Sequence, residues 1–419
     1  MIGYRLKMLR IKKGLTQEEL SDGIISISYI SQIERDNKKL PKYVAEDLAK
    51  RLNVSVDYLL GDDLRNDVSY LKDQFSPIYQ LIEKGQSAEA LEQLNDLKKC
   101  YVEAMNHPEI SPYLHTVYIL IEYQKRDFLK VESLIQSSLE EDEPYKGYPL
   151  VILHRVRGVM EYLKHNIDSS VEYFKKAIDI ASTEKYFDEL GRLYQNIGTS
   201  YAVQKEFYKA SQSFYSALKV YRENVDLNGQ IKTHINLGNV LSDIDEEEEA
   251  IEWYHKAIAL LQYSPNELLE SAVKYNLAHS YFQIGEKSRA KELTMETIEA
   301  KKALGDDSGL TRCQLLLCDI YLENDQIKNL KQTLLNTSLS VENIDDPNLL
   351  SKYYRIFGKL LHIKEDFKGF EEYYLKSIEH YEQVNDYKII GDMYFELAEN
   401  ISSEKYYKLS AEYYRKGAL

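Results

Sequence analysis

Two segments spaced forty residues apart carry one pattern. Residues 194–201 read Tyr-Gln-Asn-Ile-Gly-Thr-Ser-Tyr, and residues 234–241 read His-Ile-Asn-Leu-Gly-Asn-Val-Leu. After each Gly, a small residue, a large aromatic residue and a second small residue follow at the same offsets. They are Ala210, Phe214 and Ala217 in the first segment, and Ala250, Tyr254 and Ala257 in the second. Such a fixed period indicates one structural unit that is repeated.

The same register continues in both directions along the chain. The position of the Gly reads Gly158, Gly198, Gly238, Ala278, Cys318, Gly358 and Ala398, and the later large position runs from Leu94 and Leu134 through Phe174 to Tyr374 and Tyr414. Small residues let two helices cross closely, and large residues fill the groove beside the crossing. The pattern resembles the tetratricopeptide repeat, lengthened beyond its usual 34 or so residues. It implies a right-handed superhelical solenoid of about nine helical hairpins over residues 70–419.

Composition agrees with an all-α chain. The 419 residues include only 8 Pro and 18 Gly, and 44% are hydrophobic. Net charge is −15, but residues 1–61 carry 11 basic and 8 acidic residues, which leaves a +3 head on a −18 body. A small cationic head on an acidic body suits one DNA-contacting module attached to a different domain.

Several functional classes lack support in the sequence. No run of about 18 apolar residues suggests a membrane span, and no signal peptide is visible at the start. The three cysteines, Cys100, Cys313 and Cys318, are best explained as free thiols in a reducing compartment. The chain holds no hydrolase, nucleotide-binding or metal-ligand motif. We therefore expect a cytoplasmic protein that is not an enzyme and has no cofactor or metal.

The head has local signals for four or more short helices. Gly14 ends a first basic helix, and Thr16 with Glu19 forms a capping box at the start of a second. Ser26 or Ser28 caps a third helix, and residues 43–52 form a fourth. The Cro/phage-repressor-type helix-turn-helix domain is resembled by three segments, Lys13–Leu20, Ser28–Arg35 and Leu48–Leu52. Asp36 departs from that family, which usually has Gly there, and the turn before the third helix is one residue shorter.

That resemblance implies a DNA-reading surface. The third helix enters the major groove with its N-terminal end first, so Ile27, Ser28 and Gln32 face base edges. The residues expected to hold phosphates are Gln17, Ser31, Arg35 and Lys38. For Arg35 and Lys38 the alternative is a simple solvated surface.

One inward position of the repeats carries Asn196, Asn236 and Asn276 in succession. An Asn side chain offers a donor and an acceptor, so it can pair with the backbone of an extended peptide lying in the groove. Neighbouring inward positions add Arg192, Gln195, Lys232, Asn239, Asp243, His279, Gln283 and Arg312. The cations suit a ligand carboxylate. The alternative is that the Asn side chains only satisfy contacts between helices.

The complete arrangement is similar to the RRNPP family of peptide-pheromone-responsive regulators, most closely its neutral-protease-regulator branch. The resemblance implies a helix-turn-helix domain at 1–61, a link at 62–69 and a tetratricopeptide domain at 70–419. It also implies a short signalling peptide in the groove, a homodimer or tetramer, and a palindromic double-stranded operator. The alternative function is an adaptor that sequesters or dephosphorylates a response-regulator-type protein.

Overall fold

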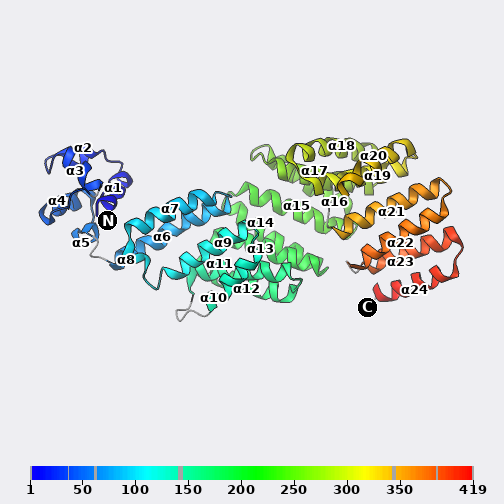
Figure 1. Cartoon of the computed structure of the whole chain (residues 1–419), viewed down its shortest axis with the longest axis horizontal. Helices are drawn as coiled ribbons and strands as arrows, with labels where there is room; N and C mark the ends of the chain where they lie inside the picture. The colour runs from blue at the N-terminus through cyan, green and yellow to red at the C-terminus, as the bar shows by residue number, and fades with distance from the viewer. Residues whose placement is uncertain are drawn as a thin grey trace. The chain divides into compact units, whose positions relative to one another are not determined.

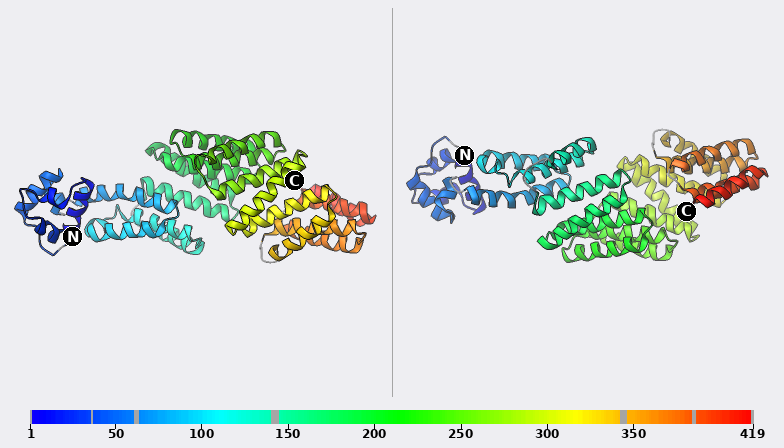
Figure 2. Two further views of the ribbon diagram at one scale, coloured as in Figure 1. Left: turned by 90° about the horizontal axis from the view of Figure 1, so that it is seen from above. Right: turned by 90° about the horizontal axis from the view of Figure 1, so that it is seen from below.

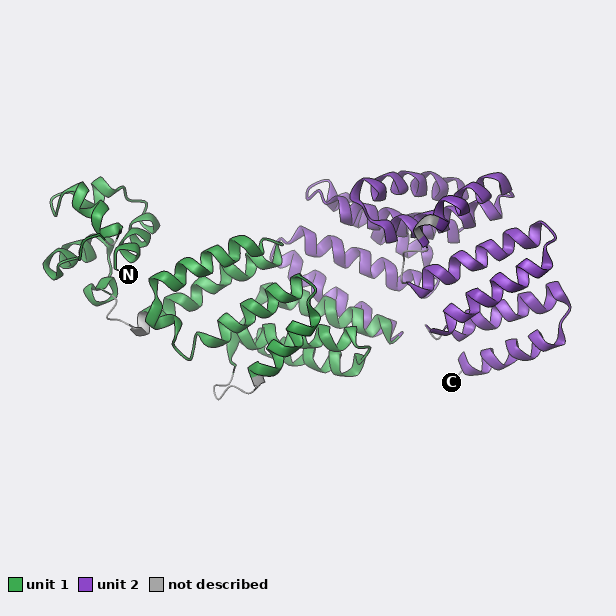
Figure 3. Ribbon diagram, viewed as in Figure 1, with its two compact units in different colours: residues 1–204 green, residues 205–419 purple. Residues whose placement is uncertain are grey.

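The computed structural model describes residues 2–35, 37–60, 64–139, 145–341, 346–383 and 386–417. Every regular element in these ranges is a helix, which confirms the prediction of an all-α chain. The chain divides into two compact units, residues 1–204 and 205–419 (Figure 3). No described helix combines the length and the apolar character needed to cross a bilayer.

The first unit contains the head and the first repeats (Figure 1). Its helices are α1 (Ile2–Lys12), α2 (Gln17–Ser21), α3 (Ile27–Glu34), α4 (Lys42–Leu52), α5 (Val56–Leu60), α6 (Leu64–Glu83), α7 (Ser87–Cys100), α8 (Val102–Met105), α9 (Ser111–Gln124), α10 (Phe128–Leu139), α11 (Gly147–Leu163), α12 (Ile167–Glu184) and α13 (Phe187–Val203).

The second unit consists of repeat helices alone. These are α14 (Phe207–Glu223), α15 (Leu227–Ser242), α16 (Glu247–Leu261), α17 (Glu267–Gln283), α18 (Lys287–Leu304), α19 (Asp307–Glu323), α20 (Ile327–Val341), α21 (Pro347–Ile363), α22 (Phe367–Gln383), α23 (Tyr387–Ile401) and α24 (Glu404–Gly417).

The head folds from the local signals in its sequence. The Thr16 hydroxyl accepts a hydrogen bond from the Glu19 backbone and the Glu19 carboxylate accepts one from the Thr16 backbone, so the predicted capping box is confirmed. Ser26, the first of the two serines proposed, caps α3. Ile30 and Ile33 of α3 are buried in one core with Leu6 of α1. This core fixes which face of α3 turns outward.

The repeats are antiparallel helix pairs that pack in series. In the second unit α15 packs on α16, α17 on α18, α19 on α20, α21 on α22, and α23 on α24. The first helices α15, α17, α19 and α21 also contact one another in turn. Figure 2 shows these pairs from green to red along the chain. Stacking of hairpins in this way is the tetratricopeptide type of helical solenoid.

The small position of the repeat is small because an aromatic ring occupies the space of its Cβ. A Cβ atom added to Gly238 would lie 2.4 Å from Cε1 of Tyr254, and one added to Gly158 would lie 2.5 Å from Cε1 of Phe174. Both rings are buried. In the repeat after Gly238 the small residue is Ala278, and the residue sixteen positions on is the smaller Thr294. The large and small positions therefore compensate each other.

The stretch expected to link the domains is partly helical. Helix α6 begins at Leu64, inside the expected link 62–69, and its Asp67 and Val68 are buried. Asp67 forms an ion pair with Arg5 of the head. A polar residue at this position therefore serves that contact and does not indicate a loop. Asp62 and Asp63 lie outside the described residues. The domain boundaries themselves stay predictions.

Candidate functional site

The outward face of α3 holds the residues predicted to read DNA. Ile27 is 46% exposed, although it is a large apolar residue, and Ser28 beside it is also exposed. Ser31 and Gln32 are half-buried on the same helix. An exposed β-branched side chain next to a hydroxyl at the N-terminal end of the helix suits contact with a thymine methyl and a base edge.

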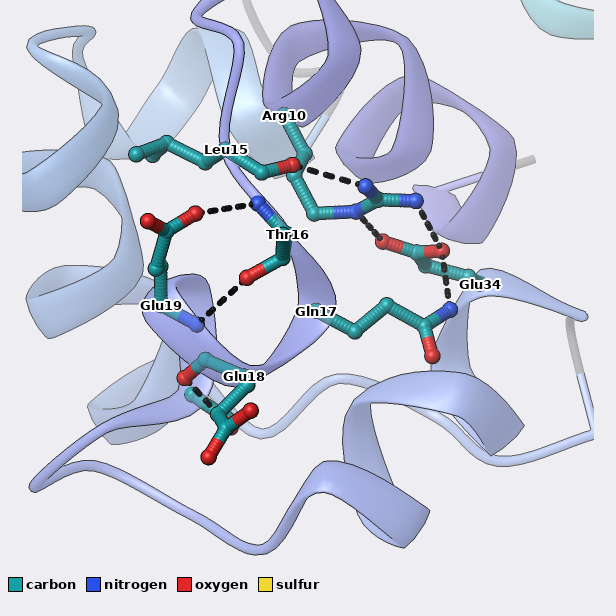
Figure 4. A network of polar contacts seen from close by, with 8 residues as sticks. Arg10, Leu15, Thr16, Gln17, Glu18, Glu19 and Glu34 are labelled. Atoms are coloured by element: carbon teal, nitrogen blue, oxygen red, sulfur yellow. Dashed lines mark hydrogen bonds and ion pairs between the residues drawn. The ribbon is translucent and has the colours of Figure 1, made fainter.

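The opposite end of α3 is held from inside the head (Figure 4). The Arg10 guanidinium donates to both carboxylate oxygens of Glu34 and to the Leu15 carbonyl. The hydrogen bond with Glu34 raises the pKa of Arg10. Gln17 also donates to Glu34, from Nε2 to Oε2 at 2.7 Å. The amide of Gln17, predicted to hold a phosphate, is thus already engaged in positioning α3.

The remaining predicted phosphate contacts are two cations after the end of α3. Arg35 and Lys38 are both exposed. Nζ of Lys38 lies 4.8 Å from the ring centroid of Tyr29 on α3. This contact keeps the positive charge beside α3, the predicted recognition helix. Asp36, the departure from the usual Gly, lies outside the described residues.

In the first unit, Arg192 has its charge compensated. Its Nη1 lies 2.8 Å from Oε1 of Glu189, a fully buried carboxylate. Arg155 reaches the same carboxylate at 2.9 Å and also pairs with Glu83. Tyr148 donates to Glu189 as well. Arg192 therefore belongs to a buried ion network. The sequence pattern predicts only a ligand contact for this residue.

Asn196 lines a pocket of about 570 Å³ in the first unit. The pocket is mainly apolar and aromatic, and its lining includes Tyr123, Phe128, Tyr162, Leu163, Phe174 and Thr199. Gln195, its predicted neighbour, is half-buried on the same helix. The lining also includes the Gln124 amide and the Arg126 guanidinium. A pocket with a few polar groups among apolar side chains suits a peptide unit beside an apolar side chain.

In the second unit, Asn276 and Asn239 contact each other directly. Asn276 Nδ2 donates to Asn239 Oδ1 at 2.8 Å, and the same oxygen accepts from the Tyr254 hydroxyl at 2.9 Å. Within the described part of the chain, the side chains of Asn236 and Lys232 form no hydrogen bond or ion pair. Asn276 is therefore partly engaged by a contact between helices, whereas Asn236 has an unused donor and acceptor.

Asn276 and Arg312, forecast from separate repeats, line the same pocket. This pocket of about 300 Å³ also includes Tyr275, Lys301, Asp306, Ser308 and Gly309. Lys301 pairs with Asp306 at 2.7 Å, and Arg312, which is exposed, pairs with Asp346 at 3.3 Å. His279 lies one turn from Asn276 along α17 and contacts Gln283 at 3.3 Å, and burial lowers its pKa. Asp243 is exposed.

Two further inward residues were missed from the sequence. Lys352 Nζ lies 2.9 Å from Asp319 Oδ2, and both side chains are mostly buried. Burial lowers the pKa of Lys352, but the charge of Asp319, its hydrogen bond and the charge of Tyr275 together outweigh burial, so the net shift is upward. The signal was present, since Lys352 occupies the register of Lys232 and Arg312, and Asp319 that of Asn239 and His279.

The described residues offer little for metal or thiol chemistry. No group of three or more His, Cys, Asp or Glu side chains among them is placed to hold a metal ion. Cys100, Cys313 and Cys318 are all buried and unpaired in disulfides. Burial raises the pKa of Cys100 and of Cys313 to about 12, so neither thiol is ionised near neutrality.

Comparison with known proteins matches both parts of the chain. A helix-turn-helix family model matches residues 6–59, and a tetratricopeptide-repeat model matches residues 231–260. The transcriptional activator NprA of Geobacillus stearothermophilus is 23% identical over 415 residues, which cover 94% of this chain and 98% of NprA. The chain is thus similar to a transcriptional activator over nearly its whole length.

Solved structures agree with these matches at the level of the fold. The apo quorum sensor NprR from B. thuringiensis has a TM-score of 0.68 at 16% identity, covering 83% of this chain and 97% of NprR. NprR in complex with its cognate peptide NprX gives 0.60 at 17% identity, covering 82% and 97%. Apo RapI gives 0.64 at 18% identity, covering 83% and 98%. Together with the two family models, these matches confirm the predicted helix-turn-helix and repeat architecture.

Proposed function

We propose that this chain is a cytoplasmic transcription regulator of the RRNPP type that binds operator DNA through α3 and is switched by an oligopeptide in the groove of the repeats. It acts as a homodimer on a palindromic operator, because a two-fold protein meets two half-sites. It is not an enzyme, and its relative NprA is a transcriptional activator.

The packing and exposure of α3 support the DNA-binding part of the proposal. Its inner face is buried, its end is fixed by Arg10 and Glu34, and its N-terminal outer face with Ile27 and Ser28 is open. A rigid helix with an exposed N-terminal end is what major-groove reading requires. The +3 charge of residues 1–61 favours approach to the phosphate backbone.

The peptide part depends most on one observation: Asn276 and Arg312 line a common pocket in the second unit. Asn276 uses one N–H for Asn239 and keeps its Oδ1 without a partner among the described residues, and Arg312 is exposed. The two can therefore offer partners to a peptide unit and to a carboxylate. Asn236, with no partner among the described residues, supplies a further amide on the preceding first helix. The solved NprR complex contains a peptide. We infer that this chain takes a short peptide as well.

A DNA-binding assay with and without peptide tests the proposal. The peptide fraction of the host culture supernatant is added to full-length protein, and binding of fluorescent genomic operator fragments is followed by anisotropy. We expect the fraction to change DNA affinity at least about tenfold, equivalent to 1.4 kcal/mol of differential binding. Indifference to peptides, together with capture of a receiver-type protein, would favour the adaptor function instead.

A further inference from the structure

A buried arginine joins the head to the first repeat helices. Arg5 of α1 is only 5% exposed. Its Nη1 donates to the Tyr58 carbonyl at 2.6 Å, inside the head, and its Nη2 donates to Asp67 Oδ2 of α6 at 2.8 Å. Asp67 is 3% exposed. One planar guanidinium therefore connects α1, α5 and α6, because its fixed donors reach two acceptors from separate nitrogen atoms, whereas a lysine has a single ammonium nitrogen.

Aromatic contacts extend this junction along α1. The Arg5 guanidinium lies 4.8 Å from the ring centroid of Tyr101, which follows α7. Lys12, at the other end of α1, has its Nζ 5.0 Å from the ring of Tyr70 on α6. Tyr4, next to Arg5 in the sequence, packs against the hydrophobic core of the repeat helices. Cations over aromatic faces and a ring in the neighbouring core make a continuous contact rather than a single point.

The other face of α1 supports the recognition helix. Leu6 and Leu9 share a core with Ile30 and Ile33 of α3. Ile27 and Ser28 stay exposed in this arrangement. Helix α1 is thus packed between α3 on one side and α6 and α7 on the other, and the docked head leaves its DNA-reading face open.

We propose that α1 is the docking surface that fixes the head on the repeats, with Arg5 as the positioning residue. The direction of α3 is then set by the direction of α6, so a movement of the first repeat helices moves the recognition helix with it. In a dimer this fixes the separation of the two recognition helices and therefore the half-site spacing. That last step rests on the proposed function, whereas the docking itself does not.

Distance measurements on the full chain without DNA or peptide test the docking. Nitroxide labels are placed on Glu46→Cys of α4 and Gln136→Cys of α10, two exposed positions, while the native thiols are buried. We expect one narrow distance distribution. Asp67→Ala removes the partner from the repeat side and leaves the Arg5–Tyr58 bond of the head intact. Its distribution is expected to broaden at least about twofold, because an undocked head samples many orientations.

Two further variants separate docking from folding. Asp73→Ala removes an exposed carboxylate from the same helix and is expected to keep the narrow distribution. Arg5→Lys keeps the positive charge but loses the planar guanidinium donors. It is expected to broaden the distance distribution partially. If the circular dichroism spectrum shows that Asp67→Ala is unfolded, the distance distribution of Arg5→Lys decides whether the head is docked. A narrow distribution in every folded variant of this pair overturns the proposal.

Operator binding then extends the test to function. Wild type should prefer one half-site spacing by about tenfold over spacings changed by half a helical turn, and Asp67→Ala should lose that preference. Broadening without any DNA binding supports docking and contradicts the proposed function. DNA binding together with an unchanged distance distribution in Asp67→Ala supports the proposed function and contradicts docking.

Discussion

Arg10 holds Glu34 through two hydrogen bonds, from Nε to Oε1 at 2.6 Å and from Nη2 to Oε2 at 3.1 Å. The pair ties the start of the head to the end of the recognition helix, and the Glu34 side chain is only 3% exposed. The position of α3 is therefore a tertiary property of the head.

Glu34→Ala is expected to destabilise the head by about 3 kcal/mol, because it leaves the Arg10 charge largely buried without its partner. Chemical denaturation followed by circular dichroism measures the loss. Glu18→Ala, which removes an exposed carboxylate of α2, serves as the control and should change stability by less than about 0.5 kcal/mol. Equal losses in both variants would contradict a structural role for the pair.

Gln32→Ala is expected to weaken binding to the specific operator by about 1–3 kcal/mol, with little effect on random DNA. Lys38→Ala should weaken both about equally and reduce the salt slope by about 1, as for a phosphate contact. Titrations at several salt concentrations separate the two effects. A uniform loss for Gln32→Ala would move base reading to other residues.

Asn236→Ala is expected to remove the response to peptide while DNA affinity without peptide stays within about twofold of wild type, since the head is untouched. Isothermal titration with the active peptide, together with the operator assay, gives both numbers. Asn228→Ala is the matched control, because Asn228 is an exposed Asn on the same helix. An unchanged peptide affinity would exclude Asn236 from the site.

Gly238→Ala is expected to destabilise the second unit by about 1–3 kcal/mol, because the added Cβ overlaps the ring of Tyr254. Adding Tyr254→Leu should recover part of the loss by making room for the methyl group. Thermal unfolding of the single and double variants measures this coupling. Strict additivity of the two changes would show that the predicted overlap does not matter.

Acid is expected to destabilise the repeats through two histidines. Burial lowers the pKa of His154 and of His234 from 6.5 to about 4, and the nearby cations Arg222 and Lys256 add to the effect at His234. An unfolded histidine binds a proton at a higher pH than the folded one. Stability is therefore full above about pH 6.5 and falls as the pH drops towards 4, by about 3 kcal/mol for His234.

His234→Phe tests this pH dependence, since the phenyl ring keeps the contact with Trp253 and cannot be protonated. The free energy of unfolding is measured by denaturant titration at several pH values between 7 and 4. The variant should show a shallower slope than wild type, and identical slopes would mean that His234 does not carry the effect. His255→Phe, at an exposed histidine, is the control.

Local chemistry determined much of this protein from its sequence alone. The forty-residue period, the Gly-to-aromatic spacing, the capping box at Thr16 and the apolar face of α3 each depend on neighbours within a turn or a hairpin, so a sequence pattern specifies them. The Asn row could be found for the same reason, because equal offsets in a repeat place residues at equivalent positions.

Only the tertiary structure decided which of these side chains are available. Asn276 donates to Asn239, Arg192 pairs with Glu189, and Gln17 donates to Glu34. Asn236, by contrast, has no partner among the described residues. The junction of Arg5 with Asp67, 62 positions apart, is equally invisible to a periodic pattern. Hydrogen bonds and ion pairs act over a few ångströms in space, and the distance along the chain does not reveal which groups the fold brings within that reach.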